Sequence, residues 1–355
     1  MPVNPLVFDG HNDTLLDLFG GRSDTPRSFF NRSEHGHLDL PRAREGGLGG
    51  GFFAIFVPNR YRKGHPSPHS TRTPEGVRWS LPHPVEQPYA LEFTVHLSSS
   101  LLRLEEESGG AFKVVRSAAA LEACLATGTV AAILHAEGAE FIDPGLHALD
   151  VLVHAGMRSL GIVWSRPNIF ANGVPFNFPD SPDTGDGLTE LGKALVRRCN
   201  QLRVMLDLSH LNEKGFWDVA ALSDAPLVAT HSNAHALAAS PRNLTDKQLA
   251  AVRDSGGVVG VNFHKGFLRA DGNAQRKTSV SEIARHAVYM AERMGIDHVA
   301  LGSDFDGALM PDDLHDVAGL PRLLDALRAA GFDEPALRMI AHENWLRVLR
   351  LTWGE

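Results

Sequence analysis

The 355-residue chain has little cysteine and no excess of basic charge. Its two cysteines, Cys124 and Cys199, are not part of a CxxC pair, so the sequence argues against a disulfide scaffold and against a thiolate zinc site. Lysine and arginine together number 34, against 42 aspartates and glutamates, which gives a net charge of −8. Because a nucleic-acid-binding protein needs a basic footprint, no nucleic-acid partner is expected.

Long apolar runs are also missing. No stretch of about 18 apolar residues occurs, so the sequence predicts no membrane-spanning helix and no membrane partner. The first residues, MPVNPLVFDGHND, carry no basic region followed by an apolar one, which argues against a signal peptide. We therefore expect a cytoplasmic protein. Histidine is abundant instead, with 18 residues, and several histidines directly follow apolar runs.

Short apolar runs alternate with amphipathic stretches along the whole chain. Each run is bounded by turn or polar residues and is continuously apolar, as is typical of a strand that is buried on both faces. Thr245 with Gln248 and Ser279 with Glu282 have the spacing of helix capping boxes. The predicted strands are residues 6–13, 50–58, 129–138, 159–165, 204–210, 227–233, 258–264 and 299–307.

Eight strands that alternate with helices predict an α/β fold, a (β/α)8 TIM barrel that spans residues 1–355 as a single domain. Residues 20–46 and 59–88 break the alternation. Each of these segments follows a strand, so both are predicted to be insertions on the C-terminal face of the barrel. A long loop on that face is either a lid over the site or a flexible surface segment, and the sequence favours neither.

The end of the first strand carries a candidate metal-binding pair. The motif DGHND places His11 and Asp13 two residues apart, and side chains at such positions of a strand point the same way. A single pair is more often a polar strand end, but other strands repeat the pattern. Their candidate ligands are Glu137 in HAEG, with Glu140 as a rival, His210 in DLSH, His231 in THSN and Asp304 in GSDFDG.

These side chains all follow strands at the end where such barrels keep their active sites. Barrel closure would gather enough imidazole and carboxylate groups for two divalent ions. Without thiolates this donor set suits zinc best, with manganese, iron or cobalt as alternatives. Two ions would share a hydroxide and polarise a carbonyl or phosphoryl oxygen. The pattern therefore predicts a hydrolase. Asp304 could take the proton of that hydroxide.

A cation also follows the sixth strand. Arg242 stands in the segment SPRN, beyond His231. Its guanidinium could clamp a substrate carboxylate with two hydrogen bonds, or it could be a solvated arginine at a helix end. The spacing alone does not decide between these two interpretations.

In combination, the motifs resemble those of the membrane dipeptidase (renal dipeptidase) family of binuclear zinc peptidases, which belongs to the amidohydrolase-like barrels. They occur in the order DGHND, HAEGAE, GMRSL, DLSH, THSNAHAL, SPRNLTD, GGVVGVNF and GSDFDG and cover essentially the whole chain. The resemblance implies two Zn²⁺ ions per chain. His11 and Asp13 would bind one ion, His210 and His231 would bind the other, and Glu137 would bridge them.

The resemblance also implies a reaction and an assembly. Family members cleave dipeptides, often with a D residue at the C-terminal position, and are commonly dimers. We therefore expect a small dipeptide substrate and a homodimer. Arg242 would bind the terminal carboxylate of the substrate. Asp304 would be the catalytic aspartate, and Glu137 would serve catalysis as the bridging ligand.

Two positions depart from the family pattern. The family has a strand that ends in Thr-His, whose histidine contacts the region of the scissile carbonyl, whereas this chain has Trp164 in that place. An indole donates one hydrogen bond but cannot take up a proton and pass it on at neutral pH. After VNF, where an aromatic residue is common, the chain has His264. We expect Trp164 and His264 to bind substrate and to reshape the pocket.

Two alternatives stay open. One is a related metal-dependent hydrolase of the same barrel class that acts on an amide, a lactam or an N-acyl amino acid, and Trp164 keeps this alternative open. The other is a metal-binding protein without catalytic activity. The first is weakened because many such barrels begin with HxH and use a carboxylated lysine, whereas this chain has HxD and a glutamate.

Overall fold

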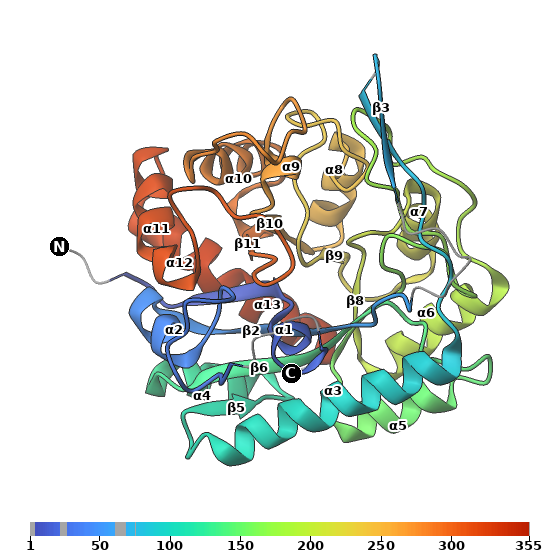
Figure 1. Cartoon of the computed structure of the whole chain (residues 1–355), viewed down its shortest axis with the longest axis horizontal. Coiled ribbons are helices and arrows are strands. Elements are labelled where there is room, and N and C mark those ends of the chain that lie inside the picture. The colour runs from blue at the N-terminus through green and yellow to red at the C-terminus, as the bar shows by residue number, and fades with distance from the viewer. Residues whose placement is uncertain (1–3, 22–26, 61–68, 75, 355) are drawn as a thin grey trace.

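Parallel strands form the centre of the computed structural model, which describes residues 4–21, 27–60, 69–74 and 76–354. Helices surround these strands (Figure 1). Neighbouring strands pair in parallel in the order β1-β2-β6-β7-β8-β9-β10-β11. Their bounds are β1 Val7–Asn12, β2 Leu48–Phe56, β6 Val130–Glu137, β7 Ser159–Gly161, β8 Met205–Asp207, β9 Val228–Ala229, β10 Val258–Asn262 and β11 Val299–Gly302.

The last strand returns to the first and brings the barrel to near closure. The backbone N–H of Asp13 donates to the carbonyl oxygen of Phe305 at 2.8 Å, and that of Asp304 donates to His11 at 2.9 Å. The predicted (β/α)8 fold is confirmed. Because His11, Asp13 and Asp304 make these contacts with their backbones, the seam of the barrel runs through the group of candidate site residues.

The helices cover the outside of this ring. Their bounds are α1 Thr14–Phe19, α2 Leu40–Gly46, α3 Gln87–Glu107, α4 Ala118–Thr127, α5 His147–Ala155, α6 Glu190–Leu202, α7 Glu213–Leu222, α8 Asp246–Asp254, α9 Lys265–Leu268, α10 Ser281–Met294, α11 Leu320–Ala329, α12 Glu334–Arg338 and α13 Asn344–Trp353. Three described strands were not predicted: β3 (Ser70–Thr73) and β4 (Gly76–Trp79), which lie in the second insertion, and β5 (Phe112–Val114), which pairs with the first residues of β6. Among the described residues, no helix is both long and apolar enough to span a bilayer.

Four strands end at least three residues earlier than predicted. The runs 159–165, 204–210, 227–233 and 299–307 leave the sheet after Gly161, Asp207, Ala229 and Gly302. The chain therefore departs from strand geometry before it reaches Trp164, His210 and His231. The residues beyond each strand stay mostly buried, so the apolar pattern continues after the hydrogen-bonded ladder has ended and cannot mark the end of the strand.

One of the two predicted capping boxes is wrong. Thr245 and Gln248 form both hydrogen bonds of the motif at the start of α8, as predicted. At Ser279, the side chain donates instead to Asp313 at 2.8 Å, and α10 begins only at Ser281. A carboxylate on a distant loop thus competes with the local cap, and a local sequence pattern contains no sign of it.

Both segments predicted as insertions contain regular structure. Residues 22–26, 61–68 and 75 lie outside the described residues, but α2 occupies the end of the first segment. In the second, β3 (Ser70–Thr73) and β4 (Gly76–Trp79) form a hairpin that projects beyond the barrel (Figure 1). Val77 and Phe178 exchange two backbone hydrogen bonds of 2.7 and 2.9 Å. The hairpin is therefore fastened to the loop that follows β7.

Side chains of the C-terminal helix α13 pack into one end of the barrel interior. Trp345 of α13 is fully buried and packs in one cluster with Phe8 and Phe52. Its indole N–H donates to the carbonyl oxygen of Leu301 at 3.1 Å. A Cβ atom at Gly260 would lie 3.1 Å from the indole atom Cζ2, so the ring and the strands pack too closely for a larger residue there.

We predict that Trp345→Ala lowers the free energy of unfolding by about 3–5 kcal/mol, because it removes a large buried side chain and leaves a cavity. Urea unfolding of the purified variant measures this loss. Trp217→Ala is a matched control, since Trp217 on α7 is 37% exposed and should change stability by less than about 1 kcal/mol. Equal losses in the two variants would contradict the role assigned to Trp345.

Candidate metal centre

The candidate ligands meet around one carboxylate at the C-terminal ends of the strands. Glu137, the last residue of β6, places Oε1 2.9 Å from Nε2 of His210, 3.5 Å from Nε2 of His231 and 3.7 Å from Nε2 of His11. Asp13 Oδ2 lies 3.8 Å from Nε2 of His11. All five side chains are buried. They form two potential ligand groups that share Glu137.

Several atoms of this cluster lack the partners that buried polar atoms normally have. Both ring nitrogens of His11 and Oδ1 of Asp13 make no hydrogen bond with any described residue. Nε2 of His210 and Nε2 of His231 face each other at 3.1 Å. Because nearly all buried polar groups are satisfied in native proteins, these atoms fit a bound cation. Imidazole and carboxylate donors without thiolate match zinc.

Further contacts orient His210 and His231, the two histidines that are grouped with Glu137. Nδ1 of His210 lies 2.8 Å from the hydroxyl of Ser165. Nδ1 of His231 lies 2.8 Å from the hydroxyl of Thr230, which donates to Asp207 at 2.6 Å. In each ring these contacts leave Nε2 facing the central carboxylate. Hydrogen bonds of this kind fix the tautomer and the direction of a metal-ligating imidazole.

The charge distribution also suits a cation. Burial lowers the pKa of His210 and of His231 well below 6.5, so both rings are neutral, which is the form that binds metals. Burial opposes protonation of His11 as well. There the attraction of Glu137 and Asp13 is larger, and it raises the pKa of His11 to about 10. The site therefore has a negative potential that a metal ion would neutralise.

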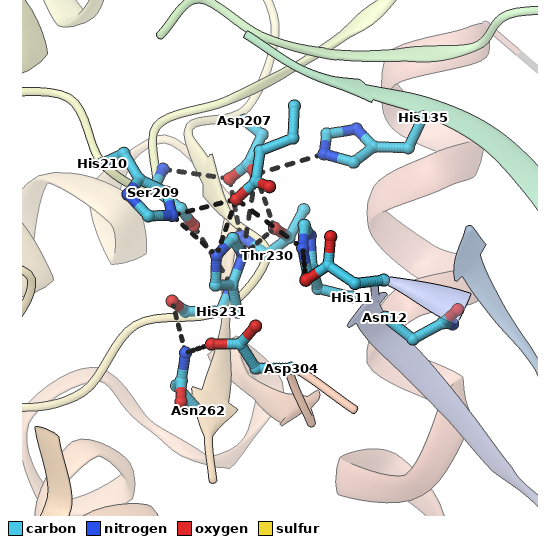
Figure 2. A network of polar contacts seen from close by, with 12 residues as sticks. His11, Asn12, His135, Asp207, Ser209, His210, Thr230, His231, Asn262 and Asp304 are labelled. Atoms are coloured by element: carbon cyan, nitrogen blue, oxygen red, sulfur yellow. Dashed lines mark hydrogen bonds and ion pairs between the residues drawn. The ribbon is translucent and has the colours of Figure 1, made fainter. Parts of the chain in front are cut away.

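Asp304 lies beside this cluster on the barrel seam. Its backbone has a φ of 63°, in the left-handed region that few non-glycine residues occupy. Nδ2 of Asn262 donates to Oδ2 of Asp304 at 2.9 Å (Figure 2). A Cβ atom at Gly307 would overlap the carboxylates of Asp13 and Asp304, so only glycine lets the loop approach so closely.

A cavity of about 800 Å³ opens onto the cluster. Trp164 and His264, the two predicted substrate-binding residues that depart from the family pattern, both line it. Burial lowers the pKa of His264 to about 4, so the ring is neutral. Its Nδ1 accepts a hydrogen bond from the backbone N–H of Gly266 at 3.0 Å. The remaining proton of His264 is therefore on Nε2.

Arg242 is buried near the cluster but does not line the cavity. One Nη atom donates to the carbonyl oxygen of His231 at 3.0 Å, and Nε has no partner among the described residues. The guanidinium carbon lies 5.4 Å from the ring centroid of Phe267, and the backbone N–H of Arg242 donates to Ser240 Oγ at 3.3 Å. Phe267 and Ser240 do line the cavity, so the cation lies directly behind its wall.

Sequence reasoning missed a second buried arginine. Arg166 is fully buried and donates to Glu140 at 2.7 Å, to Asn59 at 2.9 Å and to the carbonyl oxygen of Val57 at 2.7 Å. Its guanidinium carbon lies 5.5 Å from the ring centroid of Trp164. Glu140, the rival of the central carboxylate, is thus engaged in an ion pair. The one sequence feature that could have indicated a buried Arg166 is its position directly after the apolar run SLGIVWS.

The two glutamates should therefore respond differently to substitution. Glu140→Gln leaves the charge of Arg166 buried without its carboxylate, and we expect the free energy of unfolding to fall by about 3–5 kcal/mol with bound metal retained. Glu137→Gln should instead lose bound metal. Urea unfolding and elemental analysis of both variants test this. Retention of all metal by Glu137→Gln would contradict the assignment.

The nearly closed barrel and the buried imidazole–carboxylate cluster at its C-terminal mouth are the arrangement of a metal-dependent hydrolase. The family model for membrane dipeptidases (peptidase family M19) matches residues 3–352. This chain belongs to that family, as the sequence motifs predicted. It is therefore a metallopeptidase, and its family works with a divalent metal ion.

Solved structures and a sequence relative agree with this membership. A metallopeptidase from Rhodobacter sphaeroides, liganded with a phosphinate mimic of the dipeptide L-Ala-D-Ala, is 49% identical, covers 99% of this chain and 100% of its own, and has a TM-score of 0.92. A solved dipeptidase of family M19 is 50% identical with the same coverage and TM-score. An uncharacterized protein in the pqqA 5′ region of Klebsiella pneumoniae is 51% identical over 255 residues, 72% of this chain and 94% of its own length.

Proposed function

We propose that this protein is a zinc-dependent dipeptidase that carries two Zn²⁺ ions per chain. The observation that carries the proposal is the position of Glu137, whose carboxylate belongs to both groups of candidate ligands. Membership of the dipeptidase family and the relative crystallised with a dipeptide mimic support it. A homodimer and a cytoplasmic location stay predictions.

In this proposal His11 and Asp13 would hold one ion, His210 and His231 would hold the other, and Glu137 belongs to both groups of ligands. Zinc ions bound there would supply a water molecule activated at neutral pH and an electrophile for the scissile carbonyl oxygen. The chain keeps these ligands buried and oriented, so little reorganisation is needed when the substrate binds.

Asp304 moves the proton in this mechanism. Asn262 donates to Oδ2, which leaves Oδ1 free to accept a proton from the attacking water. The same oxygen then delivers that proton to the nitrogen of the leaving amine, because the nitrogen must be protonated as the peptide bond breaks. Trp164 cannot share this task, since an indole does not exchange its proton at neutral pH.

Arg242 supplies the charge that favours a free terminal carboxylate. Burial lowers the pKa of Arg242 to about 10, so the guanidinium stays protonated at neutral pH. The charges of Asp304, Glu137 and Asp207 attract this guanidinium, and its Nε has no hydrogen-bond partner among the described residues. A substrate carboxylate would pair with this buried donor. The substrate carboxylate would therefore lie at the end of the cavity formed by Phe267 and Ser240.

The proposal predicts metal content and activity together. Zinc-loaded protein should contain about two zinc ions per chain by elemental analysis, and it should release free amino acids from L-Ala-L-Ala or L-Ala-D-Ala. N-acetyl-alanine and a simple lactam serve as comparison substrates for the related hydrolases. Turnover of these compounds with none of any dipeptide would replace the proposed function. Fewer than about one zinc per chain would contradict the binuclear centre.

Asp304→Asn tests the proton-transfer step. We expect kcat to fall by about 10²–10⁴-fold, the usual contribution of a general acid–base, while the zinc content stays that of the wild type. Initial rates with L-Ala-D-Ala measure this change. Asp325→Asn, which changes an exposed carboxylate on α11, is the control and should keep wild-type turnover. Near-normal kcat in Asp304→Asn would remove this residue from the mechanism.

A further inference from the structure

We propose that this enzyme selects dipeptides whose N-terminal residue has a large apolar side chain, preferably an aromatic one. The inference rests on the proposed dipeptidase function and names the substrate class of that site. It is carried by a continuous row of aromatic side chains along the cavity. We call this row the aromatic wall, and it consists of Phe56, Trp164, Phe176 and Phe267.

The members of the aromatic wall touch one another in sequence. The ring centroids of Phe56 and Trp164 lie 4.8 Å apart, those of Trp164 and Phe176 5.5 Å, and those of Phe176 and Phe267 6.1 Å. Each distance is within or close to the range of favourable aromatic pairs. All four rings are half-buried and line the cavity, so their free faces form one apolar surface.

The aromatic wall begins directly at the metal centre. The centroid of Trp164 lies 5.8 Å from that of His210, and the centroid of Phe176 lies 6.3 Å from it. A substrate whose carbonyl is at the metal centre must therefore place a neighbouring side chain against these rings. The aromatic wall and the scissile peptide bond would therefore lie so close together that a side chain of the dipeptide must contact the wall.

Away from the metal centre, the described lining of the cavity offers uncharged polar groups, such as Asn59, Asn177 and Gln275, but no counter-ion for a charged side chain. Among the described residues that line it, no lysine or arginine occurs, and the only carboxylates are Asp13, Glu137 and Asp304 at the metal centre. A charged substrate side chain would lose its water without gaining a counter-ion, which is costly. A dipeptide of two alanines would fill only a small part of the cavity of about 800 Å³, and water would occupy the rest.

The wall is held in place from behind. The guanidinium of Arg166 lies 5.2 Å from the centroid of Phe56 and 5.5 Å from that of Trp164. Arg166 is itself fixed by its ion pair with Glu140. The two rings therefore form a preorganised surface, which lowers the entropic cost of binding an apolar side chain.

The direction of the row assigns the substrate position. Phe267 lies at one end, 5.4 Å from the guanidinium carbon of Arg242, and Phe56 lies at the other. If the terminal carboxylate of the dipeptide faces Arg242, the C-terminal residue lies at the Phe267 end. The N-terminal residue then lies toward Phe56 and Trp164, and its side chain meets the larger part of the wall.

Two matched dipeptide series test this inference with the zinc-loaded wild-type enzyme. The series X-Ala and Ala-X, with X as Ala, Leu, Phe, Lys or Glu, are compared by kcat/KM. We expect Phe-Ala to exceed Ala-Ala by at least about 10-fold, which is within the range that an apolar pocket can supply. Lys-Ala and Glu-Ala should fall below Ala-Ala, and the Ala-X series should vary less.

A variant links the preference to the wall. Trp164→Ala should lower the ratio of kcat/KM for Phe-Ala over Ala-Ala by at least about 5-fold, since it removes a large part of the apolar contact. Trp217→Ala, which removes an exposed indole on α7, should leave that ratio unchanged. Zinc content and urea unfolding verify that both variants are loaded and folded. Should Trp164→Ala fail to fold, the wild-type series decide alone.

The outcomes separate this inference from the proposed function. Hydrolysis of Ala-Ala at least as fast as that of Phe-Ala, or a stronger preference in the Ala-X series, overturns the inference and leaves the dipeptidase function intact. Absence of hydrolysis across both series in zinc-loaded protein overturns both. A preference for Phe-Ala that Trp164→Ala abolishes supports both.

Discussion

The burial of Glu137 between three imidazoles is the constraint on which the rest of the structure depends. A carboxylate removed from water is costly unless opposite charge compensates it, and Asp13 and Asp304 add negative charge nearby. Burial keeps His210 and His231 neutral, so of the three rings only His11, whose pKa is raised to about 10, offsets this negative charge. A divalent cation would supply the remaining compensation, and its affinity would then be part of the stability of the fold.

The same constraint couples the site to the closure of the barrel. The backbone N–H groups of Asp13 and Asp304 make the hydrogen bonds that join the last strand to the first. His210, Asp304 and Asp306 have left-handed backbones, with φ of 68°, 63° and 65°. Such conformations cost about 1–3 kcal/mol each and persist only where the surroundings impose them. Folding the barrel and building the site are therefore one event.

The sequence was sufficient for the parts of the molecule that repeat. Alternation of apolar runs and helices predicted the barrel, and the recurrence of His, Asp and Glu at strand ends predicted the cluster around Glu137. It was insufficient where partners are distant along the chain. Arg166 has its partners Glu140 and Asn59 on other loops, and Ser279 is taken by Asp313. The hydrophobic periodicity of a sequence indicates which residues are buried, but it does not indicate which buried polar groups form hydrogen bonds or ion pairs with each other.

Trp164 shows how one residue changes two properties of such a site. The resemblance implies a histidine at this position of the family, a group that can donate a hydrogen bond and transfer a proton. An indole keeps the N–H donor but cannot accept a proton, so in the proposed mechanism proton transfer falls to Asp304. In exchange the ring extends an apolar surface from Phe56 to Phe176. Arg166 behind it makes this surface rigid. In the proposed site, the loss of a proton-transferring group near the carbonyl and the gain of an apolar wall for the substrate side chain would both follow from this one difference, and hydrophobic contact would take a larger part in positioning the substrate.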